Sequence, residues 1–197
     1  MPEKSLPLKS SPIPTLLSCG GKAIEYFTRR DLLNEKVKPI THVWQLPEAT
    51  RILRKQQSNG SWSHSGKKTV TYPKNHHELV ETWKNLRILV ERYEFTKEHE
   101  AARKAAEYLF SFQTEDGDIR GMLANQYATY YTGAMLAFFI KAGYAGDVRV
   151  EKGLDWLLQM RQNDGGWSVP ILTYTLSRAT INKITGTYAE PLEPDRA

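Results

Sequence analysis

The sequence predicts an all-α fold in which pairs of helices form two layers, with inner helices covered by outer ones. Three observations predict this class. A short motif that ends helices occurs three times, and apolar and amphipathic helices alternate between its copies. The strand signal is weak, because it is confined to brief β-branched stretches at 68–72 and 173–185. Stacked helix pairs of this kind curve into a superhelix or close into a ring.

The repeated motif consists of Gln, two or three residues, Gly, any residue, and then Trp or Ile. Gln closes a helix, Asn or Asp with Gly supplies the left-handed turn, and the following ring can fold back over the Gln amide. Counted from Gln57, Gln113 and Gln162, the spacings are 56 and 49 residues, so the period is near fifty. The predicted motif positions are Gln56, Gly60 and Trp62; Gln113 and Gly117; and Gln162, Gly165 and Trp167.

The helices between the motifs differ in character. Residues 98–112 and 148–161 each carry an apolar stripe opposite a charged face, which predicts outer helices with one side in water. Residues 126–141 are apolar on nearly all sides, which predicts a buried inner helix, and residues 79–93 are intermediate.

The domain organisation follows from the ends of the chain. Four prolines lie within the first 14 residues, so 1–14 is predicted to be an extended or disordered arm. The remainder, 15–197, is predicted to be a single domain. A chain of 197 residues is long enough to bury a sizeable core.

Composition excludes several classes of protein. The net charge of +5 comes without the dense basic stripe and interleaved aromatics of a nucleic-acid groove, so we expect no nucleic-acid partner. The most apolar stretch, 128–142, is shorter than the ~20 residues of a membrane span, so we expect no transmembrane segment. A single cysteine, Cys19, and the lack of a secretory signal favour a reducing compartment, and we expect the cytoplasm.

Residues 56–62 and 162–167, with the helix endings before them, resemble the glutamine–tryptophan repeats of the squalene and oxidosqualene cyclases and of the related prenyltransferase repeat proteins. The resemblance covers roughly residues 41–168. It implies an α/α toroid, or a partial toroid, of inner and outer helices with a repeat of about 50 residues. Closed rings of that family need more helix pairs than three motifs provide. We therefore expect the chain to be a fragment, or to bury the open end of its arc by self-association.

The resemblance does not assign a reaction. Protonating terpene cyclases carry Asp-x-Asp-Asp, ionising terpene synthases carry Asp-Asp-x-x-Asp, and prenyltransferases hold zinc with Asp, Cys and His. In this sequence no two aspartates are adjacent, and Cys19 is the only thiol. The nearest acidic cluster, Asp116-Gly117-Asp118, lies in a motif turn. The sequence therefore predicts neither a cofactor nor a metal.

The ligand cavity of a two-layer helical ring is its centre, lined by one end of the inner helices. Aromatic residues with a few polar groups there would suit an isoprenoid, whose cations are stabilised by aromatic faces, and equally a sugar chain stacked on rings. The run His76-His77-Glu78 favours helix capping over metal binding, because adjacent histidines on a helix point about 100° apart. The predicted substrate-binding residues are His42, Trp44, His76, His77, Trp83, Gln126, Tyr127, Tyr130 and Tyr131.

Three functions remain open. The first is a terpenoid cyclase-like or prenyltransferase-like protein that acts on or binds an isoprenoid in a central aromatic cavity. The second is a carbohydrate-active toroid similar to polysaccharide lyases, in which a tyrosine beside a histidine and an arginine serves β-elimination. The third is a non-catalytic binding or interaction scaffold, which the missing acidic motifs favour.

Overall fold

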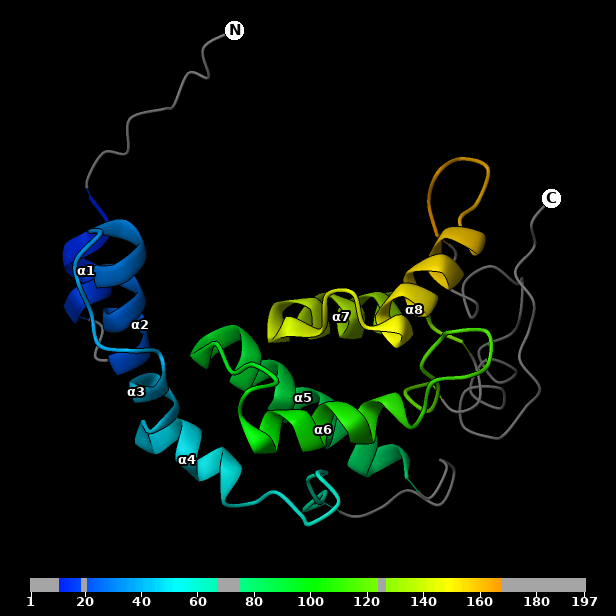
Figure 1. The fold of residues 1–197 in the computed structure, drawn as a ribbon, viewed down its shortest axis with the longest axis horizontal. Helices are drawn as coiled ribbons and strands as arrows, with labels where there is room; N and C mark the ends of the chain where they lie inside the picture. Colours follow the sequence, from blue (N-terminus) through cyan, green and yellow to red (C-terminus); the bar gives the residue numbers. More distant parts are fainter. Residues whose placement is uncertain (1–10, 19–20, 67–74, 124–126, 168–197) are drawn as a thin grey trace, which may run out of the picture. The chain divides into compact units, whose positions relative to one another are not determined.

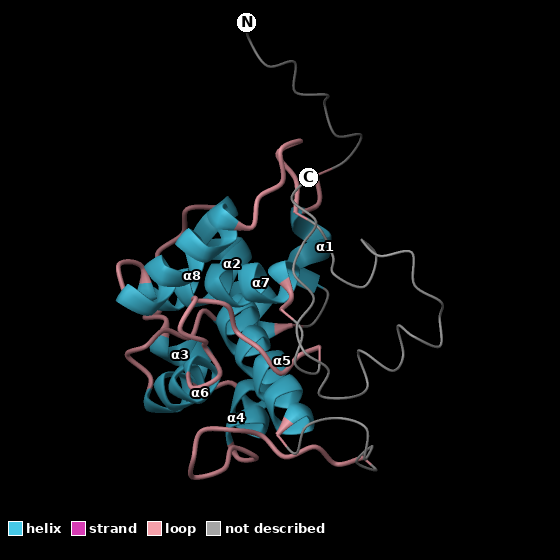
Figure 2. Ribbon diagram, turned by 90° about the vertical axis from the view of Figure 1, so that its right-hand side faces the viewer, coloured by secondary structure: helices cyan, strands magenta, loops and turns pink. Residues whose placement is uncertain are grey.

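The computed structural model describes residues 11–18, 21–66, 75–123 and 127–167. Figure 1 shows the order of the helices along the chain, and Figure 2 shows helices and loops but no strand among the described residues. The prediction of an all-α fold is confirmed. Several sequence predictions fall outside the described residues: the stretches 68–72 and 173–185, Cys19, Gln126 and most of the arm over 1–14.

The chain divides into two compact units between Thr50 and Arg51, where the sequence suggested one domain over 15–197. The helices of the first unit are short. Among its described residues only Thr28, Val43 and Ala49 are buried, so its core is small. The elements are α1 (Ile13–Ser18), α2 (Lys22–Phe27), a π-helical turn (Thr28–Leu32), α3 (Thr41–Trp44) and the start of α4 (Pro47–Leu53). Helix α1 begins inside the predicted arm.

The second unit contains two pairs of helices. Helix α6 packs on α5 and α8 packs on α7, and α5 and α7 also contact each other. The first pair is therefore α5–α6 and the second pair is α7–α8. Their bounds are α5 (His76–Tyr93), α6 (Glu100–Phe110), α7 (Thr129–Phe139), a π-helical turn (Ile140–Tyr144) and α8 (Val148–Gln159).

Helices α6 and α8 are amphipathic and begin in the same way. The side chain of His99 accepts a hydrogen bond from the Ala101 N–H, and that of Asp147 accepts one from the Arg149 N–H. These caps satisfy a backbone donor that has no partner within the helix. On α6 the buried side is alanine-rich and ends in large apolar residues: Ala102, Ala105, Ala106, Leu109 and Phe110.

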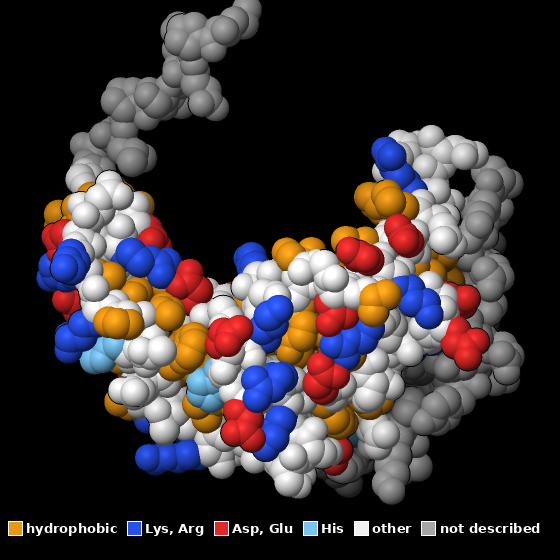
Figure 3. Space-filling model, in the orientation of Figure 1, with side chains coloured by type: hydrophobic (Ala, Val, Ile, Leu, Met, Phe, Trp, Pro, Cys, Tyr) orange, Lys and Arg blue, Asp and Glu red, His pale blue; other side chains and the backbone are white. Residues whose placement is uncertain are grey.

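The apolar composition of α7 predicted a helix buried on all sides. The structure shows that part of its surface is exposed. Its side toward α5 and α8 is buried, but Tyr130 is 44% exposed, Ile140 just beyond its end is 40% exposed, and Ala134 and Ala137 are also exposed. Figure 3 shows hydrophobic side chains exposed over α7 and α8, with acidic and basic side chains between them. Nothing in the described part of the chain covers this stripe, which is why apolar residues there meet solvent.

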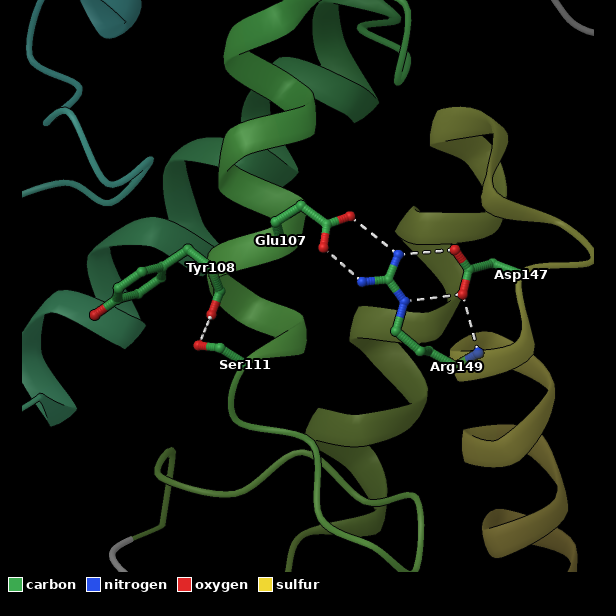
Figure 4. A network of polar contacts seen from close by, with 5 residues as sticks. All are labelled: Glu107, Tyr108, Ser111, Asp147 and Arg149. Atoms are coloured by element: carbon green, nitrogen blue, oxygen red, sulfur yellow. Dashed lines mark hydrogen bonds and ion pairs between the residues drawn. The ribbon is translucent and has the colours of Figure 1, made fainter.

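Arg149 joins the first pair to the second. Its guanidinium forms ion pairs with Glu107 of α6 at 2.6 Å and with Asp147 at 2.8 Å (Figure 4). The guanidinium carbon also lies 3.9 Å from the ring centroid of Phe110. Hydrogen bonds to Asp147 and Glu107 raise the pKa of Arg149. The bond between Arg149 and Asp147 also lowers the pKa of the Asp147 carboxyl group. This cluster fixes the start of α8 against α6.

Three turns with the same backbone geometry follow α4, α6 and α8. Each contains an isolated antiparallel bridge across six residues, and its glycine has a φ of +88°, +117° or +90°. A Cβ atom at Gly60 or Gly117 would collide with the carbonyl oxygen of Lys104 or Lys152, so glycine is required there. The bridges join Gln56 with Trp62, Gln113 with Ile119, and Arg161 with Trp167.

The glutamines of the first two turns tie one helix to the next. Gln56 Nε2 donates to the carbonyl oxygens of Gly60 at 2.9 Å and Ala101 at 2.8 Å. Gln113 Nε2 donates in the same way to Gly117 and Arg149, both at 2.8 Å. Ala101 and Arg149 are the second residues of α6 and α8. Each amide therefore closes its own turn and holds the start of a later helix.

The third turn departs from the predicted register by one residue. Arg161, rather than Gln162, occupies the position of the two glutamines, and its Nε donates to the Gly165 carbonyl at 3.0 Å. The Gln162 amide donates to the Met160 carbonyl instead. An arginine can replace glutamine here because its guanidinium also presents N–H donors at the end of a long side chain.

The tryptophan rings reach back to the preceding helix and donate hydrogen bonds to it. Trp62 Nε1 donates to the Ile52 carbonyl at 2.8 Å, and Trp167 Nε1 donates to the Leu157 carbonyl at 2.6 Å. Each acceptor lies in the last turns of the helix that the motif ends, where carbonyls have no partner within the helix.

Candidate functional site

A row of aromatic side chains crosses from α5 to α7. Trp83 and Tyr131 meet edge to face with ring centroids 5.6 Å apart, and Tyr130 lies 4.4 Å from Tyr131. Arg87, one helical turn after Trp83, places its guanidinium carbon 4.7 Å from the Trp83 ring centroid. We call Arg87, Trp83, Tyr131 and Tyr130 the aromatic row. It brings together one cation, an indole ring and two phenol rings.

Two hydrogen-bond donors of the aromatic row have no acceptor within the described part of the chain. These donors are Trp83 Nε1 and Arg87 Nε, and both atoms are buried. The Glu91 carboxylate lies 3.9 Å from Arg87 Nε, a weak ion pair between two partly exposed side chains. A buried donor without an acceptor costs about 1–3 kcal/mol, so an oxygen acceptor placed beside either donor would be favourable. Burial, and secondarily Tyr131, raise the pKa of Tyr130, so its hydroxyl stays protonated.

An open apolar groove adjoins the aromatic row at Tyr130. Its volume is about 330 Å³. Gly133 lines this space without a side chain, and a Cβ atom there would lie 3.6 Å from Leu157 Cδ1, at ordinary contact distance. We call this the α7–α8 groove. It is lined by Thr129, Tyr130, Gly133, Leu157 and Trp167.

The predicted histidines lie at the start of α5. His76 Nδ1 is 2.7 Å from the Gly121 carbonyl oxygen, and burial lowers the pKa of His76. His77 stacks on His64 at 4.8 Å between ring centroids, and His64 Nδ1 lies 3.5 Å from Glu81 Oε1. Across the residues that the structure describes, no group of three or more His, Cys, Asp or Glu is placed to hold a metal ion.

The remaining predicted residues are placed elsewhere. Tyr127 is buried and contacts Trp156 edge to face at 6.1 Å, so it belongs to the packing beneath α8. His42 and Trp44 lie in the first unit, where His42 is exposed and lines an open, largely charged pocket of about 520 Å³. The structure thus brings together Trp83, Tyr130 and Tyr131 of the predicted set.

Sequence reasoning missed Arg87 and His64. Arg87 was detectable, because a position four residues after Trp83 lies on the same face of a helix. No local signal pointed to His64, since its partners His77 and Glu81 belong to another segment of the chain.

Comparisons with known proteins add no relative. No protein-family model matches the chain, and neither the curated proteins nor the solved structures give a match. Within the described residues, no helix has both the length and the apolarity needed to cross a membrane.

Proposed function

We propose that the chain is a helical repeat protein of the squalene cyclase and prenyltransferase type, and that it binds an isoprenoid on the aromatic row. The matched turns support the architecture, an α/α toroid or part of one with a repeat near fifty residues. Their bridges begin at Gln56, Gln113 and Arg161, which are 57 and 48 residues apart. The two helix pairs between them carry the same caps and the same glutamine contacts.

The aromatic row is the observation that carries the ligand class. Aromatic faces attract the double bonds and any cationic carbon of an isoprenoid chain, and they provide apolar contact area. The Arg87 guanidinium, and the Trp83 N–H that has no acceptor among the described residues, fit the oxygen atoms of a phosphate, diphosphate or hydroxyl head group. A ligand with an apolar chain and an oxygen-bearing head therefore matches both ends of the row.

The proposal is a binding function and leaves the reaction unassigned. The carboxylate of Glu91 forms a weak ion pair with the row, at 3.9 Å from Arg87 Nε. The lyase alternative needs Tyr, His and Arg together. His76 and Arg87 are eleven residues apart on one helix, which corresponds to about 16 Å along its axis. The row is therefore better suited to an isoprenoid than to β-elimination.

Calorimetric titration of the full chain with farnesyl diphosphate, farnesol and a polyuronate tests the proposal. We expect Trp83→Leu to weaken binding of both isoprenoids. Arg87→Met should weaken farnesyl diphosphate binding by about 10- to 100-fold and affect farnesol little, since a charged hydrogen bond contributes about 1.5–3 kcal/mol.

Arg92→Met is the matched control, because Arg92 is an exposed arginine on the same helix. Its affinity for farnesyl diphosphate should equal that of the unmodified chain. Binding of the polyuronate alone, or equal losses in Arg87→Met and Arg92→Met, would contradict the assignment to the row.

A further inference from the structure

The first unit contains a pocket of about 520 Å³ that the aromatic row does not use. It is lined by residues of α2 and the π-helical turn after it, by residues 35–38, and by His42, Val43 and Leu46. All of these residues lie within Met1–Thr50, so the pocket belongs to a single compact unit. Its volume falls in the range of small-molecule sites, about 300–1,000 Å³.

The segment 35–38 is tied at both ends to the elements with which it forms the pocket. At one end the Glu35 N–H donates to the Arg29 carbonyl oxygen at 2.8 Å, and the Arg29 guanidinium pairs with the Glu35 carboxylate at 2.9 Å. At the other end the Tyr26 hydroxyl donates to the Lys38 carbonyl oxygen at 2.8 Å. These contacts keep the pocket formed without the help of a ligand.

Both carboxylates that line the pocket are already engaged by cations. Glu25 pairs with Lys22 at 3.1 Å and with Arg29 at 3.2 Å, and Arg29 also holds Glu35. The hydrogen bonds from Lys22 and Arg29 lower the pKa of Glu25, and those to Glu35 and Glu25 raise the pKa of Arg29. Lys22 and Arg29 therefore balance the two glutamates.

The lining carries two further lysines, Lys36 and Lys38, so its four cations and two carboxylates give a net charge of +2. No carboxylate in the described part of the chain forms an ion pair with either lysine. A concave surface lined by an excess of one charge attracts ligands of the opposite charge. The pocket therefore favours an anion with about two negative charges.

Apolar groups make up the rest of the lining. Val43 is buried, and Tyr26, Val37 and Leu46 are half-buried. An inorganic anion alone would leave these groups without a partner. A phosphate monoester carries a charge of about −1.5 to −2 at neutral pH, and lysine binds phosphate as a point charge. A monoester with a compact apolar body thus matches both the charge and the apolar part of the lining.

We propose that this pocket binds a small, soluble phosphate monoester. Lys36 and Lys38 hold the phosphate, and Tyr26, Val43 and Leu46 contact the apolar body. The inference concerns another unit and another ligand than the isoprenoid proposal, so either can fail alone.

Titration of the full chain with phenyl phosphate at low salt, followed by amide NMR, tests the pocket and locates the binding. We expect the amide signals of 35–38 and of 42–46 to shift. Benzyl alcohol, which keeps the ring and lacks the phosphate, should bind at least about tenfold more weakly. Because the lysines are exposed, affinity for phenyl phosphate should fall as salt is added.

The double variant Lys36→Met/Lys38→Met should weaken phenyl phosphate binding at least about tenfold, since it removes the two unbalanced charges. The matched control is Lys55→Met/Lys141→Met, which removes two exposed lysines outside the pocket and should change the affinity less than about twofold. Unchanged amide positions of the buried Thr28 and Ala49 show that the first unit of each variant is folded.

Four results would overturn the proposal. The first is the absence of amide shifts at millimolar phenyl phosphate. The second is an equal loss of affinity in the two double variants, which would reduce the effect to net charge. The third is a set of shifts confined to α5 and α7, which would place the phosphate on the aromatic row. The fourth is binding to vesicles that contain phosphatidate without a response to phenyl phosphate, which would make a lipid head group the ligand.

Discussion

Replacing Gln113 with methionine removes the amide that ties the second turn to α8 while keeping a side chain of similar length. Gln113 Nε2 donates to the carbonyl oxygens of Gly117 and Arg149, each at 2.8 Å. Methionine has no donor, so both carbonyls lose a partner in a partly buried site. The substitution therefore separates the hydrogen bonds from the packing of the side chain.

The expected loss follows from these two bonds. Each contributes about 1 kcal/mol net, and a buried carbonyl left without a donor adds to the cost, which gives about 2–3 kcal/mol for Gln113→Met. With a urea m-value of about 2 kcal/mol/M, the unfolding midpoint should fall by about 1 M. Gln113→Glu should cost more at neutral pH, since its carboxylate would face two carbonyl oxygens.

Urea unfolding followed by circular dichroism measures this loss, with Gln162→Met as the matched control. Gln162 belongs to the third turn, but among the described residues its amide donates only to the Met160 carbonyl two residues away, at 3.1 Å. We expect that variant to lose no more than about 0.5 kcal/mol. Equal midpoints for Gln113→Met and Gln162→Met would refute the idea that the amide joins neighbouring helices.

Two further variants test the turns and the caps. Gly117→Ala would place a Cβ atom 2.5 Å from the Lys152 carbonyl oxygen at a φ of +117°, so we expect a loss of about 3 kcal/mol in urea unfolding. Gly146→Ala, at a φ of +79° in open space, should lose about 1 kcal/mol, and equal losses would argue against the close approach. Burial lowers the pKa of His99, whose Nδ1 accepts the Ala101 N–H at 3.2 Å. The unfolded chain therefore binds more protons below the ordinary pKa of 6.5, so this part of the stability is complete above that pH and falls as the pH drops through the folded-state pKa. His99→Asp should make the unfolding midpoint less dependent on pH between about 7 and about 5, and an unchanged dependence would assign it to another group.

The helix endings could be predicted because they depend on local chemistry. Gly60, Gly117 and Gly165 each have the positive φ that a helix stop requires, and the sequence around each showed it. The distant acceptor of each amide could not be predicted in this way. Gln113 reaches Arg149, which is 36 residues further along the chain, and no pattern within the motif points to that residue.

The predicted register of the third turn was wrong for a related reason. The sequence motif favoured Gln162 because the motif was defined by glutamine. The backbone bridge instead fixes the position, which is residue 161, and a long side chain with a suitable donor can occupy it. Arg161 meets that condition.

The candidate site shows the same division between local and distant information. Aromatic composition marked Trp83, Tyr130 and Tyr131, but their order in the aromatic row arises from the packing of α5 against α7. Helical periodicity also predicted that α7 is buried, since its sequence is apolar on nearly every side. Periodicity describes the helix alone, and the exposed stripe depends on which neighbours are present.

The glutamine contacts also order events during synthesis of the protein. Gln113 is made before the carbonyl that it will hold, because Arg149 follows it by 36 residues. At about 5–20 residues per second, roughly 2–7 s pass before that acceptor exists. Throughout that interval α6 can form and close its turn, but it has no hold on the helix to come. Until Arg149 is made, the first pair is held by its own packing and by Gln56, so a pause within the second pair would prolong the period in which the bond from Gln113 to α8 is missing.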